Sequence, residues 1–124
     1  MTLQKGKAQI LKIYLGEADR YQGKPLYEAL VLGAREAGMA GATVYKGILS
    51  FGASHSIHTM KIFALSADMP VTVEIIDSSE KIKSFAEKAN EMLEKSKRGG
   101  LLTIQDVDVI NYKPGEKYSQ VKSC

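Results

Sequence analysis

Apolar and polar residues alternate along several short stretches of the chain, the period of a β-strand. In residues 8–15 the alternation puts Leu11, Ile13 and Leu15 together on one face, so this strand has one apolar side. Residues 42–49, 71–76 and 101–110 are rich in β-branched and apolar residues and also predict strands. Residues 57–65 predict a further strand or hairpin arm.

Two other stretches repeat apolar residues every three or four positions, the period of an amphipathic helix. The first begins at Pro25, which suits a first helical turn because it has no amide hydrogen to leave unpaired, and stops at Gly38. The second begins near Ser79 and ends in cations and glycines that suit a helix C-terminus. Its apolar positions are Ile82, Phe85, Ala86, Ala89 and Leu93.

The order of these elements is that of two consecutive βαβ units. Such units side by side give a ferredoxin-like α+β fold, an antiparallel sheet with two helices on one face. We expect one domain over residues 1–112 and a polar, flexible tail over 113–124. Since the helices cover only one face of the sheet, the other face predicts an oligomer.

Composition narrows the class of protein. The chain has 124 residues, of which 44% are hydrophobic and 25% charged, as in ordinary soluble domains. Its apolar runs are too short to cross a membrane, and its N-terminus lacks a secretory h-region, so we expect a cytoplasmic protein. The net charge of +3 is spread along the chain, which argues against nucleic acid as a partner.

Catalytic machinery is not visible in the sequence. There is no G-x-S-x-G elbow, and the one cysteine is Cys124. The two histidines, His55 and His58, have no evident third metal ligand, so no metal site is assigned. Glu74, inside an apolar strand, is expected to face an interface or a salt bridge. No catalytic residue is predicted.

Two glycine-containing loops are the candidate ligand-binding segments. The first follows a strand and offers a glycine and a hydroxyl; the second precedes the last strand and offers cations and free backbone amides. Together they would suit a phosphate-bearing molecule. The predicted residues are Phe51, Gly52, Ala53 and Ser54 in the first loop, and Lys97, Arg98, Gly99 and Gly100 in the second.

The stretch Gly41-Ala42-Thr43-Val44, with Gly47 and Phe51-Gly52 after it, resembles the G-x-T-V…G-F-G sequence that leads into the T-loop of the PII nitrogen-signalling proteins. Over residues 5–112 the chain is also similar to a prokaryotic family of PII-like proteins known as domain of unknown function 190. The motifs carrying that similarity are Gly16-Glu-x-Asp19, Gly23-x-Pro25-Leu26-Tyr27, the segment 34–44, Phe51-Gly52-Ala53 and His58-Thr59.

This resemblance implies a homotrimer with inward-facing sheets and an adenine nucleotide in each cleft between subunits. Thr43 matches the threonine near the adenine, and Gly52 matches the glycine at the T-loop base. Gly100 matches the later glycine of the PII G-D-G-K pattern, but Leu101 replaces its phosphate-binding lysine. With Lys97 and Arg98 as the remaining cations, AMP or ADP is favoured over ATP. No cofactor is required, and a membrane transporter is a candidate partner.

Two functions of other classes stay open. One is a trimer that binds or confers tolerance to divalent metals, with His55, His58 and Asp68 as conceivable ligands. The other is a small enzyme with a site built between subunits. A PII-like ligand-sensing regulator is the function that the resemblance favours.

Overall fold

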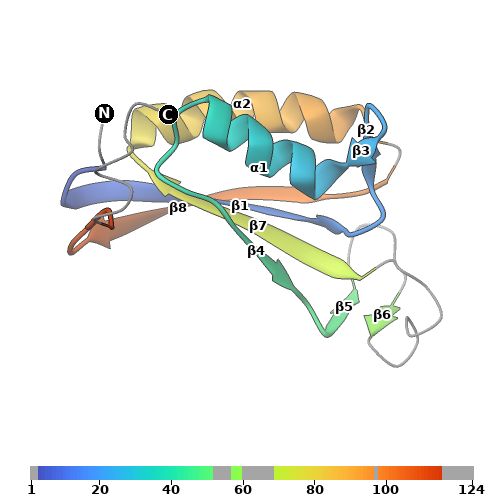
Figure 1. Cartoon of the computed structure of the whole chain (residues 1–124). Helices are drawn as coiled ribbons and strands as arrows, with labels where there is room; N and C mark the ends of the chain where they lie inside the picture. Colours follow the sequence, from blue (N-terminus) through green and yellow to red (C-terminus); the bar gives the residue numbers. More distant parts are fainter. Residues whose placement is uncertain (1–2, 52–56, 60–68, 97, 116–124) are drawn as a thin grey trace.

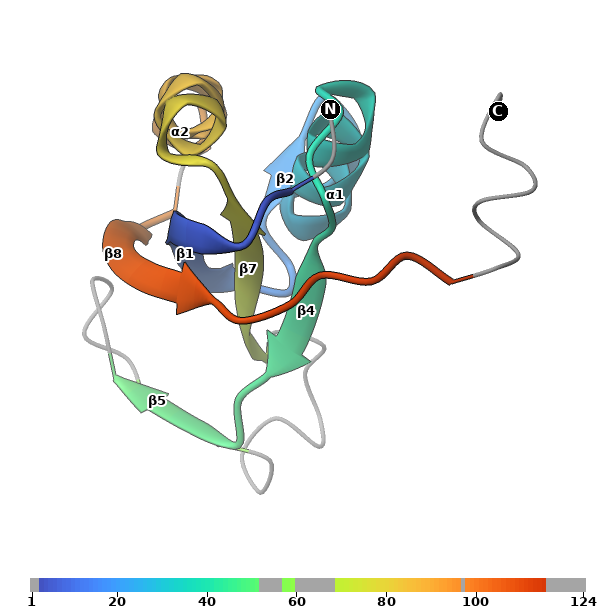
Figure 2. The same ribbon diagram turned by 90° about the vertical axis from the view of Figure 1, so that its left-hand side faces the viewer.

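The structure is a computed structural model, and it describes residues 3–51, 57–59, 69–96 and 98–115. Its main sheet has four strands in the order β4-β7-β1-β8, with every neighbouring pair antiparallel. The strands are β1 (Gly6–Gly16), β4 (Thr43–Lys46), β7 (Pro70–Asp77) and β8 (Leu101–Val109). Helices α1 (Leu26–Glu36) and α2 (Ser79–Glu94) lie on the same face of the sheet (Figures 1 and 2). The predicted ferredoxin-like α+β fold is confirmed.

The hydrophobic core lies between this sheet and the two helices. Leu11, Ile13 and Leu15 are buried, as the alternation in β1 predicts, because successive side chains of a strand point to opposite faces. Burying a side chain of this size stabilises the fold by about 1.5–3 kcal/mol. The rest of the core comes from β7 and the helices: Leu26, Leu30, Ala34, Val71, Val73, Ile75, Ile82, Phe85, Ala89 and Met92. The predicted Ala86 and Leu93 pack at its border.

Both helices end where the sequence places their signals. Pro25 directly precedes α1, so the helix begins one residue later than predicted. Gly38 lies two residues after the end of the helix and has φ 76°. Gly38 N–H donates to Arg35 O (3.1 Å) and Met39 N–H to Ala34 O (3.0 Å), the paired bonds of a Schellman motif, which needs a left-handed residue at Gly38. Ser78 caps α2 by accepting a bond from the Lys81 amide at 3.3 Å.

The predicted strand over residues 42–49 is wrong as a single element. β4 stops at Lys46, and the Gly47 N–H then donates to Pro70 O at 2.7 Å. β5 (Leu49–Phe51) leaves the main sheet and pairs with β6 (Ile57–Thr59) in a separate two-stranded sheet. β6 is the described part of the strand predicted over 57–65, and residues 60–65 lie outside the described residues.

The polar connection after β1 contains a small hairpin that was not predicted from the sequence. Its strands are β2 (Arg20–Tyr21) and β3 (Lys24–Pro25). Gln22 and Gly23 form the turn with φ 50° and 83°, the positive values that a type I′ turn needs at both central positions. The hairpin brings the chain from the end of β1 to the start of α1.

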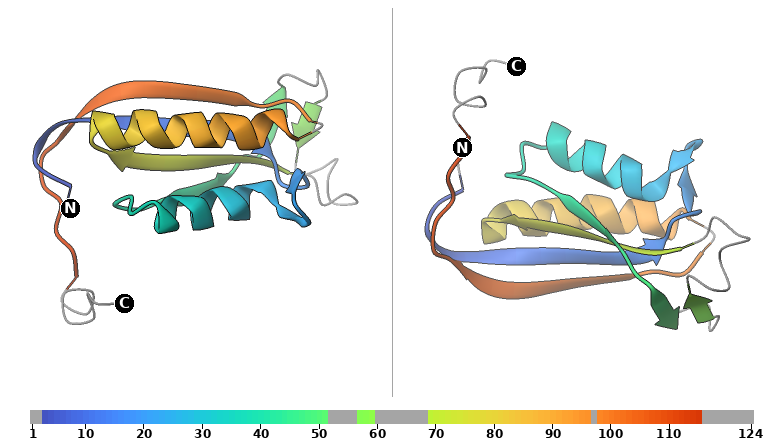
Figure 3. Two further views of the ribbon diagram at one scale, coloured as in Figure 1. Left: turned by 90° about the horizontal axis from the view of Figure 1, so that it is seen from above. Right: turned by 60° about the horizontal axis from the view of Figure 1, so that its bottom comes forward.

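The second face of the main sheet, here called the open face, carries no helix within the described residues (Figure 3, right). Register places Tyr45, Thr72, Tyr14 and Leu101 in one row across it. Tyr45 is 50% exposed, Tyr14 39% and Leu101 55%. Large apolar side chains in a row at the surface are typical of an interaction site. No helix in the described part of the chain is both long and apolar enough to span a membrane.

Candidate ligand-binding site

Apart from Phe51, at the end of β5, the predicted site residues that the structure describes lie at the two edges of the main sheet. Thr43 begins β4 at one edge, opposite Glu74 of β7, whereas Arg98, Gly99 and Gly100 precede β8 at the other edge. Since β7 and β1 lie between, the edges are three strand spacings apart, about 14 Å. Figure 2 shows β4 and β8 at opposite sides of the sheet. A single chain therefore does not bring Thr43 next to the loop before β8.

Thr43 lines a hollow of about 520 Å³, which lies toward the end of the sheet where β7 and β8 finish. This volume is within the range of pockets that hold small ligands. The walls come from segments that share no signal in the sequence: Leu3 before β1, the α1–β4 loop and the start of β4, β7, and the end of β8 with the chain after it. The lining residues are Leu3, Ala40, Gly41, Ala42, Thr43, Glu74, Ile76 and Val107–Tyr112.

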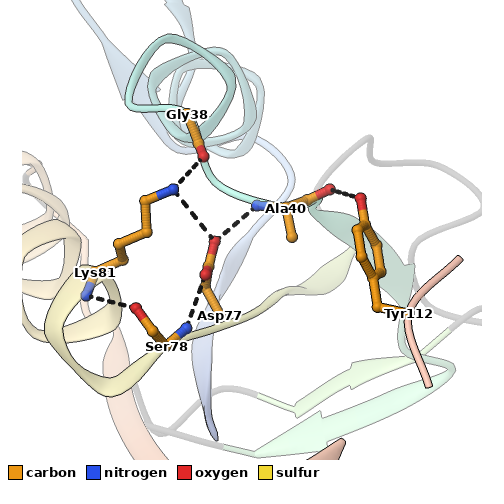
Figure 4. A network of polar contacts seen from close by, with 6 residues as sticks. All are labelled: Gly38, Ala40, Asp77, Ser78, Lys81 and Tyr112. Carbon is orange, nitrogen blue, oxygen red and sulfur yellow. Dashed lines mark hydrogen bonds and ion pairs between the residues drawn. The ribbon is translucent and has the colours of Figure 1, made fainter. Parts of the chain in front are cut away.

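A buried carboxylate holds the wall of the hollow in place (Figure 4). Asp77 is 3% exposed and accepts bonds from the Ala40 N–H at 2.8 Å and the Ser78 N–H at 2.7 Å. Lys81 Nζ lies 3.9 Å from Asp77 Oδ2 and donates to Gly38 O at 2.6 Å. These bonds to charged groups tie the α1–β4 loop to the junction between β7 and α2, so the backbone that leads to Thr43 is fixed.

Two tyrosines complete the surroundings of Thr43. Tyr112 OH donates to Ala40 O at 3.3 Å and attaches the chain after β8 to the α1–β4 loop. Tyr45 OH donates to Glu74 Oε1 at 3.0 Å. This hydrogen bond, together with the negative charge of Glu74, raises the pKa of Tyr45 above its ordinary value. The described partner of Glu74 is therefore a tyrosine on the open face, not the cation of a salt bridge.

The loop before β8 contains one glycine that the packing requires. A Cβ at Gly100 would lie 2.6 Å from Leu93 Cδ1 and 3.1 Å from the Tyr14 carbonyl oxygen. Gly99 is exposed, and the Arg98 side chain is 52% exposed, with its backbone N–H donating to Ser96 Oγ at 3.2 Å. A reachable guanidinium beside glycine amides is a suitable environment for an anion.

The turn after β1 contacts this loop and the end of β4, and no binding role was predicted for it. Asp19 is buried, with its side chain 1% exposed, and its Oδ1 lies 3.6 Å from Arg98 Nε. Its Oδ2 accepts a bond from the Gly16 N–H at 3.2 Å. Glu17 pairs with Lys46 at 3.3 Å and donates its N–H to Met69 O at 2.7 Å. In the sequence, the Gly16-Glu-x-Asp19 motif was the signal that could have pointed to these two carboxylates.

Several predicted residues are not placed by the structure. Gly52, Ala53, Ser54 and Lys97 lie outside the described residues, as do His55 and Asp68. Phe51 is described, as the last residue of β5. Among the residues that the structure describes, no three His, Cys, Asp or Glu side chains gather as a metal site would require. The assignment of these residues to a ligand site stays a prediction.

Comparison with known sequences places the chain in a family. The profile of DUF190, described as Uncharacterized ACR, matches residues 8–109. The chain belongs to the DUF190 family. A UPF0166 protein of Aquifex aeolicus is 42% identical over 104 residues, covering 84% of this chain and 94% of its own length. The UPF0166 protein MJ1524 of Methanocaldococcus jannaschii is 40% identical over 112 residues, covering 90% and 97%.

Solved structures similar to this DUF190 protein have the PII-like fold. CPII, a nitrogen regulatory PII-like protein from Thiomonas intermedia K12 bound to ADP, AMP and bicarbonate, matches with a TM-score of 0.65 at 18% identity, covering 88% of this chain and 93% of that one. The GlnK–ATP complex of B. subtilis matches with a TM-score of 0.55 at 14% identity, covering 84% of each. The suspected DUF190 family and the PII-like fold are confirmed.

Proposed function

We propose that this DUF190 protein is a PII-like regulator that senses an adenine nucleotide, AMP or ADP in preference to ATP, in clefts between the subunits of a homotrimer. The observation that carries the proposal is the separation of Thr43 from Arg98 on opposite edges of one sheet. Two halves of a site that cannot meet within a chain can meet when the edges of neighbouring chains come together.

The hollow around Thr43 is the proposed base-binding half. It combines apolar walls such as Ile76 and Val109 with hydrogen-bonding groups such as Thr43 and Glu74. This mixture suits a flat heterocycle that needs both stacking surface and a few polar contacts. CPII and GlnK, which share the fold, were solved with adenine nucleotides.

The loop before β8 is the proposed phosphate-binding half. Arg98 supplies a guanidinium and Gly99 and Gly100 supply backbone amides, with the predicted Lys97 as a second cation. Phe51, Gly52, Ala53 and Ser54 are proposed to line the same cleft. Because an apolar residue, Leu101, follows the glycines, fewer phosphate charges are neutralised than a triphosphate requires. This charge balance favours AMP or ADP.

The open face is the proposed trimer interface. Its row of Tyr45, Tyr14 and Leu101 leaves apolar surface that a second copy of the chain would bury. A regulator of this kind needs no resident cofactor and no catalytic group. We further propose that it acts in the cytoplasm on a protein partner, with a membrane transporter as the candidate.

Calorimetric titration of the whole chain with AMP, ADP and ATP, combined with light scattering after size exclusion, tests the proposal. We expect a trimer that binds ADP or AMP more tightly than ATP. R98Q should lower the affinity for ADP by about tenfold to a hundredfold, since a charge-assisted bond is lost. R35Q, which removes an exposed arginine on α1, should leave the affinity unchanged.

T43V tests the base-binding half. Loss of the hydroxyl should lower the affinity for ADP by about threefold to tenfold. T43S, which keeps the hydroxyl, is the control. A monomer, or a trimer that binds none of the three nucleotides, would refute the proposed function. Equal losses in R98Q and R35Q would place the phosphate site elsewhere.

A further inference from the structure

The turn Gly16–Asp19 is in contact with three segments that are distant in sequence. Asp19 pairs with Arg98 in the loop before β8. Glu17 pairs with Lys46 at the end of β4 and donates its N–H to the carbonyl of Met69, just before β7. The turn therefore joins the proposed phosphate-binding loop to both ends of the segment that connects β4 to β7. Figure 1 shows these strand ends at one end of the sheet.

The two partners of the Asp19–Arg98 pair differ in freedom. The Asp19 side chain is 1% exposed and is also held by the Gly16 N–H, whereas the Arg98 side chain is 52% exposed. A fixed carboxylate restricts the guanidinium to few orientations while leaving it within reach of a ligand. Such restriction lowers the entropy lost when an anion binds. An anion on Arg98 also changes the attraction between Arg98 and Asp19.

Glu17 lies between Gly16 and Asp19 in this turn. Asp19 N–H donates to Gly16 O at 3.1 Å, so the turn is closed on itself and a shift of Asp19 moves Glu17. Glu17 in turn contacts Lys46 and Met69, next to the place where the Gly47 N–H donates to Pro70 O. The amide hydrogens of Glu17 and Gly47 therefore report on the junction between β4 and β7.

We propose that the Gly16–Asp19 turn is a positioning and coupling element: Asp19 orients Arg98 for the phosphates of the ligand, and Glu17 carries the effect of binding to Lys46 and Met69. This inference rests on the proposed function and assigns it two residues that do not touch the ligand. Coupling of this kind requires that ligand binding and the state of the junction change each other.

Amide hydrogen exchange of the whole protein, with and without saturating ADP, tests the inference. In the wild type, ADP should slow the exchange of the Glu17 and Gly47 amides. D19N should lower the affinity for ADP by about threefold to tenfold. At saturating ADP, the exchange of both amides in D19N should no longer be slowed. E87Q, which removes an exposed carboxylate on α2, should behave as the wild type. A purely structural role for Asp19 would change the affinity but keep the slowing.

K46Q examines the same coupling from an exposed residue, because Asp19 is buried and D19N can lose folding. The Lys46 side chain is 59% exposed, and K46Q should keep ADP binding while losing the ADP-dependent slowing at Gly47. Wild-type protein that binds ADP without slowing either amide, or K46Q that keeps the full effect, would overturn the inference alone. Absence of binding of AMP, ADP and ATP by calorimetry in the wild type would overturn the proposed function and this inference with it.

Discussion

The two ends of the main sheet are held together by different kinds of polar contact. At the hollow, the Asp77 carboxylate is buried and accepts two backbone N–H bonds, from Ala40 and Ser78. At the other end, Glu17 and Asp19 pair with Lys46 and Arg98, whose side chains are 59% and 52% exposed. The contacts of Asp77 hold the backbone of the α1–β4 loop and of the β7–α2 junction. The contacts of Glu17 and Asp19 hold cationic side chains that are accessible to solvent.

This difference separates stability from binding. Buried carboxylate bonds to backbone amides are costly to remove, because the amides then lack partners. The Glu17–Lys46 pair, which water reaches on both sides, contributes about 0–1 kcal/mol to stability. Arg98 balances the buried Asp19 carboxylate from a half-exposed position, where a ligand can also reach it. We therefore expect substitutions around the hollow to change folding, and substitutions around Arg98 to change ligand affinity.

D77A is expected to change the stability of the fold most. Removing the carboxylate leaves the N–H groups of Ala40 and Ser78 without this acceptor and leaves Lys81 with Gly38 O but without this negative charge, which should lower the free energy of unfolding by about 3 kcal/mol. Urea denaturation followed by circular dichroism measures it. E87A, at an exposed position of α2, should stay within about 0.5 kcal/mol of the wild type. If D77A loses no more free energy of unfolding than E87A, the contacts at the hollow do not stabilise the fold more than those at the other end of the sheet.

G100A follows, with an expected loss of about 2 kcal/mol, because a methyl group at this position meets Leu93 and the backbone oxygen of Tyr14. Leu93 can change its rotamer but the carbonyl cannot move without the strand. G115A is the matched control, since nothing lies within 4 Å of a Cβ there. Thermal unfolding of both variants compares them; equal melting temperatures would mean that the loop before β8 adapts freely.

R98Q should lower the free energy of unfolding by about 1–2 kcal/mol, less than D77A: water screens the half-exposed Arg98, but its loss leaves the buried Asp19 carboxylate without this cation. The same variant is expected to lose most of its affinity for ADP. Urea denaturation without nucleotide, set beside calorimetry with ADP, shows the two effects separately. A loss of stability comparable to that of D77A would show that the Asp19–Arg98 pair holds the fold instead of the ligand.

The smallest effect concerns Tyr45 at high pH. Its pKa is raised in the folded state by the bond to Glu74, so the stabilisation is fully present below the unfolded-state pKa of about 10 and is lost as pH rises through the folded-state pKa. The stability of wild type relative to Y45F should fall across that window. Absorbance titration should give a lower pKa of Tyr45 in E74Q; an unchanged value would exclude Glu74 as the cause.

The sequence predicted the double βαβ fold because its signals were local. Strand alternation identified Leu11, Ile13 and Leu15 as core, and Gly38 identified the end of α1. The Gly16-Glu-x-Asp19 motif was visible, but nothing local indicated that its acidic residues pair with Lys46 and Arg98. Those partners are 29 and 79 positions away from Glu17 and Asp19, and only the pairing of β1 with β8 and, through β7, with β4 brings them close.

The amino-acid sequence by itself thus determined the fold class, the faces of the helices and strands, and the family resemblance, because each depends on spacing within a few residues. Tertiary structure decided where β4 ends, since Gly47 bonds to Pro70 across 23 positions. It also decided that Thr43 and Arg98 stand at opposite edges of the sheet. The strand order β4-β7-β1-β8 is a property of the assembled sheet, and no local pattern of residues contains it.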